Sequence, residues 1–181
     1  MRFNSLEYLI LLGVTAILFF NLPRRGRLVL LIASSLIFYA FWSVPLVSLI
    51  VISALTDYTA GCMIGRTDNQ RVRRLFLVLS LCVNLGLLGY FKYANFFVEN
   101  VRAVLGASDN ARYLDILLPP GISFYTFQTM SYTIDVYRRK ITPTRSFLRF
   151  FLYVSFFPQL VAGPIERAAH LLTQFDHVAR S

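Results

Sequence analysis

Long apolar runs, separated by short polar and basic segments, form the main pattern along this chain. The runs approach the length of about 20 residues that a helix needs to cross roughly 30 Å of hydrocarbon. In a soluble domain of this size the apolar residues would come in shorter, patterned runs. The pattern therefore predicts an all-α, polytopic transmembrane protein with about five spans, at residues 6–22, 28–41, 46–64, 75–98 and 120–137.

The stretch 28–64 is ambiguous, because an interruption near residues 42–45 fits either a kink in one helix or a tight turn between two. The basic clusters on either side decide between them. Residues 24–27 and 66–74 each carry a net charge of +3. Two crossings place both clusters on the cytoplasmic side, where basic loops belong, so we predict two helices.

The remaining connections follow the same alternation of charge. The segment 99–115 has a net charge of −1, which suits the outer side, and the segment 138–149 has +5, which suits the inner side. The first apolar run is followed by arginines, whereas a signal peptide has its positive charges in front. We therefore expect an uncleaved first span with the N-terminus outside.

The last apolar segment, 146–165, does not fit a simple span. Pro158 interrupts it and Gly163-Pro164 ends it. The residues before the proline would form only about 18 Å of helix, which is too short to cross. We predict a broken or re-entrant helix here, followed at 166–181 by an amphipathic helix in the membrane interface. No linker divides residues 1–181, which we expect to form a single membrane domain.

Composition agrees with this picture. Hydrophobic residues make up 56% and charged residues 15% of the chain, and the mean hydropathy is +0.59, which excludes a disordered chain, a coiled coil or a disulfide-stapled module. The net charge of +9 lies in clusters that flank the spans, so the lipid bilayer, and not nucleic acid, is the expected partner. Cys62 and Cys82 have no neighbouring ligand residues, so no metal site is predicted.

The span 120–137 is unusually polar for a membrane helix. At steps of three and four residues, one stripe contains Tyr125, Gln128, Tyr132, Asp135 and Arg139. Such a stripe is costly in lipid, so it must face other helices or a wet cavity. Two interpretations stay open: hydrogen bonding between helices, with Asp135 paired to Arg138 or Arg139, or the wall of a substrate path.

Two further polar features lack a clear catalytic role. Asp57 lies inside a predicted span and needs a partner, for which a cytoplasmic arginine is favoured over a proton relay. His170 and His177 are seven residues apart, which does not match the spacing of metal-binding helices. Accordingly, we assign no catalytic residue.

Four ordered motifs point to a known family: 36–42 (LIFYAFW), 89–96 (GYFKYANF), 118–128 (LPPGISFYTFQ, continued by SYTIDVYR at 131–138) and 156–165 (FFPQLVAGPI). In this order they resemble the membrane-bound O-acyltransferase family, and within it the bacterial alginate and polysaccharide O-acetyltransferases. The resemblance covers nearly the whole chain.

The resemblance implies transfer of acetyl groups to hydroxyls of an exported, alginate-like polysaccharide by a multi-pass enzyme of the bacterial inner membrane. It implies a tunnel whose wall would include Tyr125, Gln128, Tyr132 and Asp135, and periplasmic acetyl-transfer proteins as partners. No bound cofactor is expected, and the acetyl donor, which would enter from the cytoplasm, is not specified. The broken-helix motif would comprise Pro158, Gln159, Gly163 and Pro164.

The family's catalytic histidine lies in the second half of its members, and nothing in this sequence matches it. We therefore expect the chain to represent the N-terminal part of such an enzyme and to be inactive alone. The alternative is a non-catalytic membrane scaffold, or a subunit of a polysaccharide export and modification complex.

Overall fold

A computed structural model describes residues 5–41, 44–105 and 121–162 together with residues 168, 171, 172 and 174. The described residues form helices and connecting turns without any strand, which confirms the all-α prediction. In chain order the helices are α1 (Leu6–Asn21), α2 (Arg24–Ala40), α3 (Val44–Arg66), α4 (Gln70–Leu105), α5 (Ile122–Tyr137), α6 (Phe147–Ser155) and α7 (Phe157–Ala162).

Two of these helices contain stretches long and apolar enough to cross a membrane, Val47–Arg66 in α3 and Gln70–Ala94 in α4. The apolar helices Leu6–Asn21 and Gly26–Ala40 are shorter. α4 extends beyond the expected span 75–98 at both ends, because polar residues such as Gln and Arg are good helix formers and a helix does not end where its apolar run ends. Part of the segment expected to be an outer loop is therefore helical.

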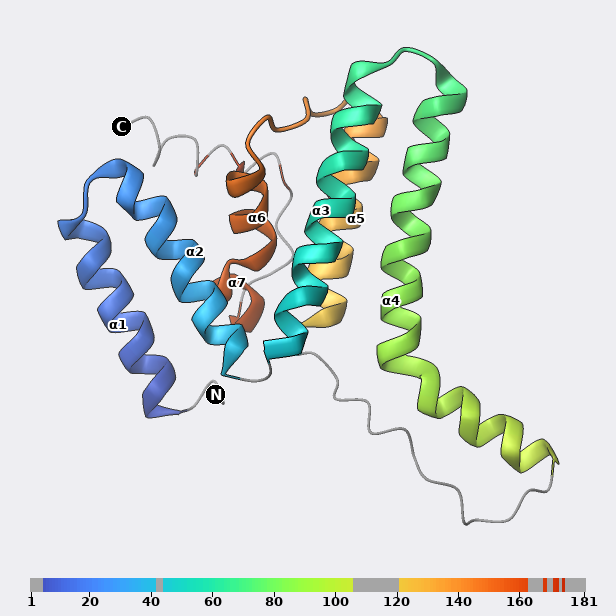
Figure 1. Cartoon of the computed structure of the whole chain (residues 1–181), viewed down its shortest axis with the longest axis horizontal. Coiled ribbons are helices and arrows are strands. Elements are labelled where there is room, and N and C mark those ends of the chain that lie inside the picture. Colours follow the sequence, from blue (N-terminus) through green and yellow to red (C-terminus); the bar gives the residue numbers. More distant parts are fainter. Residues whose placement is uncertain are drawn as a thin grey trace.

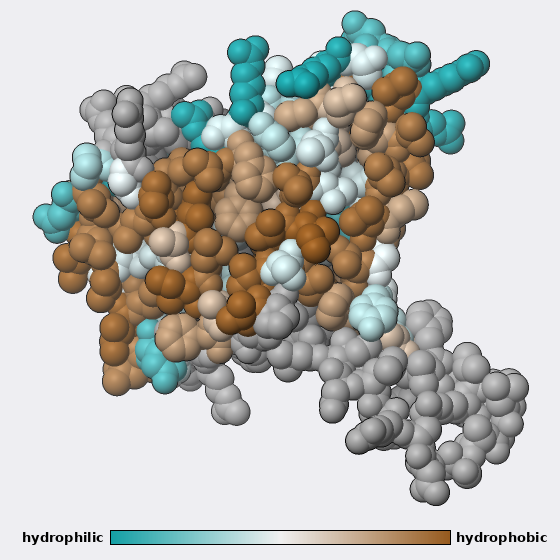
Figure 2. All heavy atoms as spheres, viewed as in Figure 1, coloured by the Kyte–Doolittle hydropathy of each residue, from teal (hydrophilic) through white to brown (hydrophobic). Residues whose placement is uncertain are grey.

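The helices run up and down relative to one another (Figure 1). The turn between α1 and α2, the turn between α3 and α4, and the chain after α5 all lie at one end, whereas α2 and α3 are connected at the other. The stretch 28–64 therefore forms two helices. Figure 2 shows hydrophilic residues gathered at the first end, which we call the basic end, above flanks that are largely hydrophobic.

Arg73 holds the basic end together. Its side chain is only 4% exposed, and its guanidinium donates to the backbone oxygens of Ile64, at 2.9 Å, and Tyr137, at 2.6 Å. Both acceptors lie at helix C-termini, where the last carbonyls have no partner within their own helix. One arginine at the start of α4 thus satisfies the ends of α3 and α5.

The core lies between α2, α3, α5 and α6 and is rich in aromatic side chains. Its largest fully buried members include Tyr39, Tyr125, Tyr132, Tyr153 and Phe150. In contrast, α1 exposes many large apolar side chains, including Leu9, Ile17 and Phe20, as expected of a helix surrounded by lipid.

The break between α6 and α7 lies at Phe156, two residues before Pro158, which was expected to interrupt the helix. Pro158 is instead the second residue of α7, where a missing N–H breaks no intrahelical hydrogen bond. The Phe157 N–H at the break donates to Ser35 Oγ of α2 at 3.4 Å. The backbone polar group is therefore satisfied inside the protein, as a low-dielectric surrounding requires.

The segment 166–181, which the sequence predicts to be an amphipathic interfacial helix, is described only at residues 168, 171, 172 and 174. Ala168 and Leu171 are 0% and 7% exposed and belong to the hydrophobic core, whereas Gln174 is exposed. At these positions the apolar side chains pack against the protein. Gly163, Pro164, His170 and His177 lie outside the described residues.

Candidate functional site

The polar helix α5 lies against α3, α4 and α6, and it presents two polar stripes to them. The first is the predicted one. Tyr125, Gln128 and Tyr132 are at most 1% exposed, whereas Asp135 is half-buried. The stripe therefore faces protein, which removes the cost of polar side chains in lipid.

Two hydrogen bonds of opposite direction join Gln128 to Tyr153 of α6. Its Nε2 donates to the Tyr153 backbone oxygen at 2.9 Å, and Tyr153 Oη donates to the Gln128 backbone oxygen at 3.2 Å. Gln128 Oε1 is also buried and accepts no hydrogen bond from any described residue. A buried oxygen in that state is unusual and marks a place where a further donor would be stabilised.

Tyr132 fills the space between α3 and α6. Its ring lies 4.6 Å from that of Phe150, and its Oη accepts a hydrogen bond from the backbone N–H of Thr144 at 3.1 Å. On the other side, a Cβ atom at Gly61 would lie 2.8 Å from Tyr132 Cε1. Gly61 is therefore required by close packing, and Tyr132 has a structural role at this position.

The predicted pairing of Asp135 with a neighbouring arginine is wrong. Arg139 Nη2 instead contacts Asp68 Oδ1 of the α3–α4 turn at 2.6 Å, and within the described chain neither Arg138 nor Arg139 forms an ion pair with Asp135. The left-handed backbone of Arg139, with φ of 59°, turns the chain at the end of α5 and takes this side chain off the helical stripe. Both partners of the observed pair are largely exposed, so its contribution to stability is small.

The second stripe surrounds Asp57, which is completely buried between α3, α4 and α5. Ser80 Oγ and Thr133 Oγ1 donate to Asp57 Oδ1, the latter at 3.1 Å, and Asn84 Nδ2 donates to Oδ2 at 2.8 Å. The expectation of an arginine partner is therefore wrong, because the carboxylate accepts hydrogen bonds from neutral donors on two neighbouring helices. Together with Ser53 and Thr129, which bond to Asn84, these residues form what we call the Asp57 network.

Asn84 extends the Asp57 network. Its Oδ1 accepts from Ser53 Oγ at 2.6 Å and from Thr129 Oγ1 at 3.5 Å. These partners were not predicted, although the sequence contains a signal for them. On each of three successive helices a polar pair stands at positions i and i+4: Ser53 and Asp57, Ser80 and Asn84, Thr129 and Thr133.

Of the predicted broken-helix motif, Pro158 and Gln159 lie on α7, and Gln159 is 9% exposed. Within the described part of the chain, no group of His, Cys, Asp and Glu side chains is arranged to hold a metal ion. The hydroxyl–carboxylate contacts among the described residues are those of Ser80 and Thr133 with Asp57, and they lie buried between helices. The arrangement of the described residues can position helices and line a polar path, but the chemistry of acyl transfer requires further groups.

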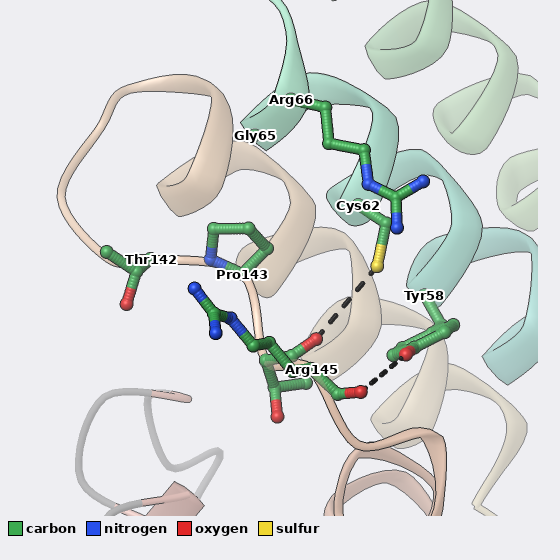
Figure 3. Close-up of a pocket in the computed structure, with 8 residues that line it drawn as sticks. Tyr58, Cys62, Gly65, Arg66, Thr142, Pro143 and Arg145 are labelled. Carbon is green, nitrogen blue, oxygen red and sulfur yellow. Dashed lines mark hydrogen bonds between the residues drawn. The ribbon is translucent and has the colours of Figure 1, made fainter.

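A separate pocket of about 680 Å³ lies at the basic end, between α3 and the segment 142–145 (Figure 3). Tyr58 Oη donates to the Arg145 backbone oxygen at 2.9 Å, and the Cys62 thiol contacts the Thr144 oxygen at 4.0 Å. A Cβ atom on Gly65 would collide with the ring of Pro143, so the segment packs directly on α3. We call this cavity the basic-end pocket.

Comparison with known proteins finds relatives over nearly the whole chain. A probable alginate O-acetylase, AlgI, of Azotobacter vinelandii is 40% identical over 88% of this chain and 33% of its own length. The protein of the same name from Pseudomonas aeruginosa is 39% identical over 98% of this chain and 35% of its own length. A peptidoglycan O-acetyltransferase of Helicobacter pylori is 35% identical over 80% of this chain and 32% of its own length.

The chain spans about a third of the length of the curated relatives it matches, and it corresponds to their N-terminal part. No family model and no solved structure matches the chain. These relatives confirm the resemblance to bacterial O-acetyltransferases that the four motifs indicated.

Proposed function

We propose that this chain, a homologue of the N-terminal part of bacterial membrane-bound O-acyltransferases, contributes the first helices of an enzyme that acetylates hydroxyls of an exported polysaccharide. The observation that carries the proposal is identity of 35–40% with proteins named as alginate O-acetylase and peptidoglycan O-acetyltransferase. The match with the Pseudomonas aeruginosa protein covers 98% of this chain, so it is not limited to one motif.

In the proposed topology α1 to α5 each cross the bacterial inner membrane, with the basic end in the cytoplasm and the N-terminus outside. The hydrophilic residues gathered at one end of the bundle (Figure 2), together with the net positive charge of segments 66–74 and 138–149, support this orientation. α1 and α5 have 16 residues each, or about 24 Å of helix, and a short span is accommodated by local thinning of the bilayer. The polar face of α5 is covered by its neighbours, so it can lie at membrane depth.

Within the complete enzyme, Tyr125, Gln128, Tyr132 and Asp135 would belong to the wall of the acyl-transfer tunnel. The buried Gln128 Oε1 supports this role, because an acceptor without a donor is a natural contact for a hydroxyl or amide of the substrate. Acetyl groups would enter at the cytoplasmic side and be passed outside to periplasmic acetyl-transfer proteins and the polysaccharide. No cofactor is assigned, and the chemistry would depend on residues outside this chain.

The test is genetic and chemical. Deletion of the gene that encodes the protein should remove base-labile acetate from the extracellular polysaccharide, and the wild-type gene should restore it. A Gln128→Ala version should restore acetylation only in part while inserting into the membrane normally. Phe127→Ala is the matched control and should restore it fully, because the Phe127 side chain is 47% exposed and lies outside the polar stripe of the same helix.

Unchanged acetate content after gene deletion would refute the proposed function and favour a non-catalytic scaffold. Equal restoration by Gln128→Ala and wild type would instead refute only the tunnel-wall role. In that case the polar stripe would serve packing between α5 and α6.

A further inference from the structure

The basic-end pocket combines positive charge with hydroxyl groups. Arg66 lines it from α3, and Arg145 lines it from the segment that follows α5, as does Thr142 (Figure 3). Thr144 is a second hydroxyl-bearing residue of the lining. The described lining includes no aspartate or glutamate, and neither arginine forms an ion pair with another described residue. Two guanidinium groups without a carboxylate partner are suited to a phosphate, which arginine binds through two parallel hydrogen bonds.

The wall that carries this charge is held in place. The hydrogen bond from Tyr58 to the Arg145 backbone and the tight contact of Pro143 with Gly65 fix the segment against α3. The backbone that bears Arg145 is therefore positioned before any ligand arrives. Preorganisation of this kind reduces the entropy lost on binding.

An apolar stripe leads from the pocket along α3. Val51, Leu55, Tyr58, Cys62 and Arg66 follow one another at steps of three and four residues, so they share one face of the helix. Val51 and Leu55 are 37% and 50% exposed. Val51 lies about 22 Å along the helix from Arg66, which exceeds the depth of about 15 Å of one leaflet.

We propose that the basic-end pocket binds the phosphate group of an anionic membrane lipid, with an acyl chain lying along this stripe of α3. The combination of a polar pocket at the membrane border with an apolar stripe below it fits a lipid better than a water-soluble phosphate, which would leave the stripe unused. This inference rests on the membrane location and not on the acetyltransferase activity. Its failure and that of the proposed function are therefore distinguishable.

The test uses the purified chain in detergent micelles and measures binding of phosphatidylglycerol by native mass spectrometry, with phosphatidylcholine and inorganic phosphate as comparison ligands. Each basic residue near the membrane surface adds to the binding of anionic lipid, so loss of two should weaken binding about tenfold or more. We expect this loss in the double variant Arg66→Gln with Arg145→Gln. The control is Arg71→Gln with Arg74→Gln, two exposed arginines at the same end that do not line the pocket.

The proposal is supported if the pocket variant loses phosphatidylglycerol, the control retains it, and phosphatidylcholine binds weakly. Equal losses in both double variants would overturn it, because general attraction to the basic end would then explain binding. Displacement of the lipid by inorganic phosphate would overturn the lipid assignment. If the glutamine variant loses its helical circular dichroism, the double variant Arg66→Lys with Arg145→Lys replaces it, because lysine keeps the charge but lacks the planar guanidinium. Its affinity for phosphatidylglycerol must still fall for the proposal to stand.

Discussion

Removal of the Asn84 side chain is the most direct test of the Asp57 network. In the Asn84→Ala variant, Asp57 Oδ2 loses its donor at 2.8 Å and Ser53 Oγ loses its acceptor at 2.6 Å. Both bonds join α4 to α3, so their loss acts on the packing of helices and not on the helices themselves. The variant also loses the bond from Asn84 Nδ2 to the Ser80 oxygen within α4.

The expected destabilisation follows from two contributions. Hydrogen bonds between membrane helices contribute about 0.6 kcal/mol on average and up to roughly 1.7 kcal/mol each. A buried acceptor left without a donor adds about 1–3 kcal/mol. With these two bonds and the longer bond from Thr129 of α5 lost, and one carboxylate oxygen unsatisfied, we expect the free energy of unfolding to fall by about 2–4 kcal/mol.

The assay is reversible unfolding of the purified chain by increasing SDS in mixed micelles, followed by helical circular dichroism. Asn21→Ala is the matched control, because Asn21 is exposed and, among the described residues, its Nδ2 bonds only the Ile17 oxygen of its own helix. It should change stability by no more than about 0.5 kcal/mol. An Asn84→Ala variant as stable as Asn21→Ala would refute the reasoning.

A double-mutant cycle measures the interaction energy between Asn84 and Asp57 apart from their other contacts. If Asn84 acts chiefly through Asp57, the combined variant Asp57→Ala with Asn84→Ala should be more stable than the two single losses added together, by about 1–2 kcal/mol. Strictly additive losses would show that the two side chains stabilise the bundle independently.

Three further outcomes are expected. Gly61→Ala should destabilise the chain by about 1–3 kcal/mol in the same SDS assay, because its Cβ would collide with the Tyr132 ring on α5. The control Gly13→Ala, whose Cβ would meet nothing within 4 Å, should not destabilise it. Equal stability of the two variants would contradict the close packing. Arg73→Ala should lower stability by about 2–3 kcal/mol, because it leaves two helix-terminal carbonyls without a donor, and an unchanged unfolding midpoint would show that water replaces the guanidinium. In a background without the native cysteines, Thr67→Cys should resist a membrane-impermeant thiol reagent added outside intact cells while Ser108→Cys reacts, and the reverse pattern would invert the proposed topology.

Much of the helical framework could be predicted from the sequence. Runs of about 20 apolar residues indicate helices whichever neighbours they have, because only a helix satisfies the backbone within one segment. The net charge of the clusters at 24–27 and 66–74 likewise predicted two helices between them, since charge at the membrane border acts on each connection separately. These properties are local, and the order of the four motifs was sufficient to indicate the family.

The partners of the polar side chains could not be predicted in the same way. Spacing places Ser53 and Asp57 on one face of a helix, but it does not determine how that helix is rotated relative to the next. Only the packing of α3 against α4 and α5 shows that Asp57 meets Ser80, Asn84 and Thr133 in place of an arginine.

The same limit applies to three further features of α5 and α6. The tight contact of Gly61 with Tyr132, the break at Phe156 and the pairing of Arg139 with Asp68 each join residues that are distant in sequence or depend on a single backbone angle. The sequence by itself thus determined which segments are helical, which end is basic and which family the motifs resemble. The tertiary structure alone decided which polar groups satisfy one another, because buried hydrogen bonds depend on helix rotation and separation to within about an ångström.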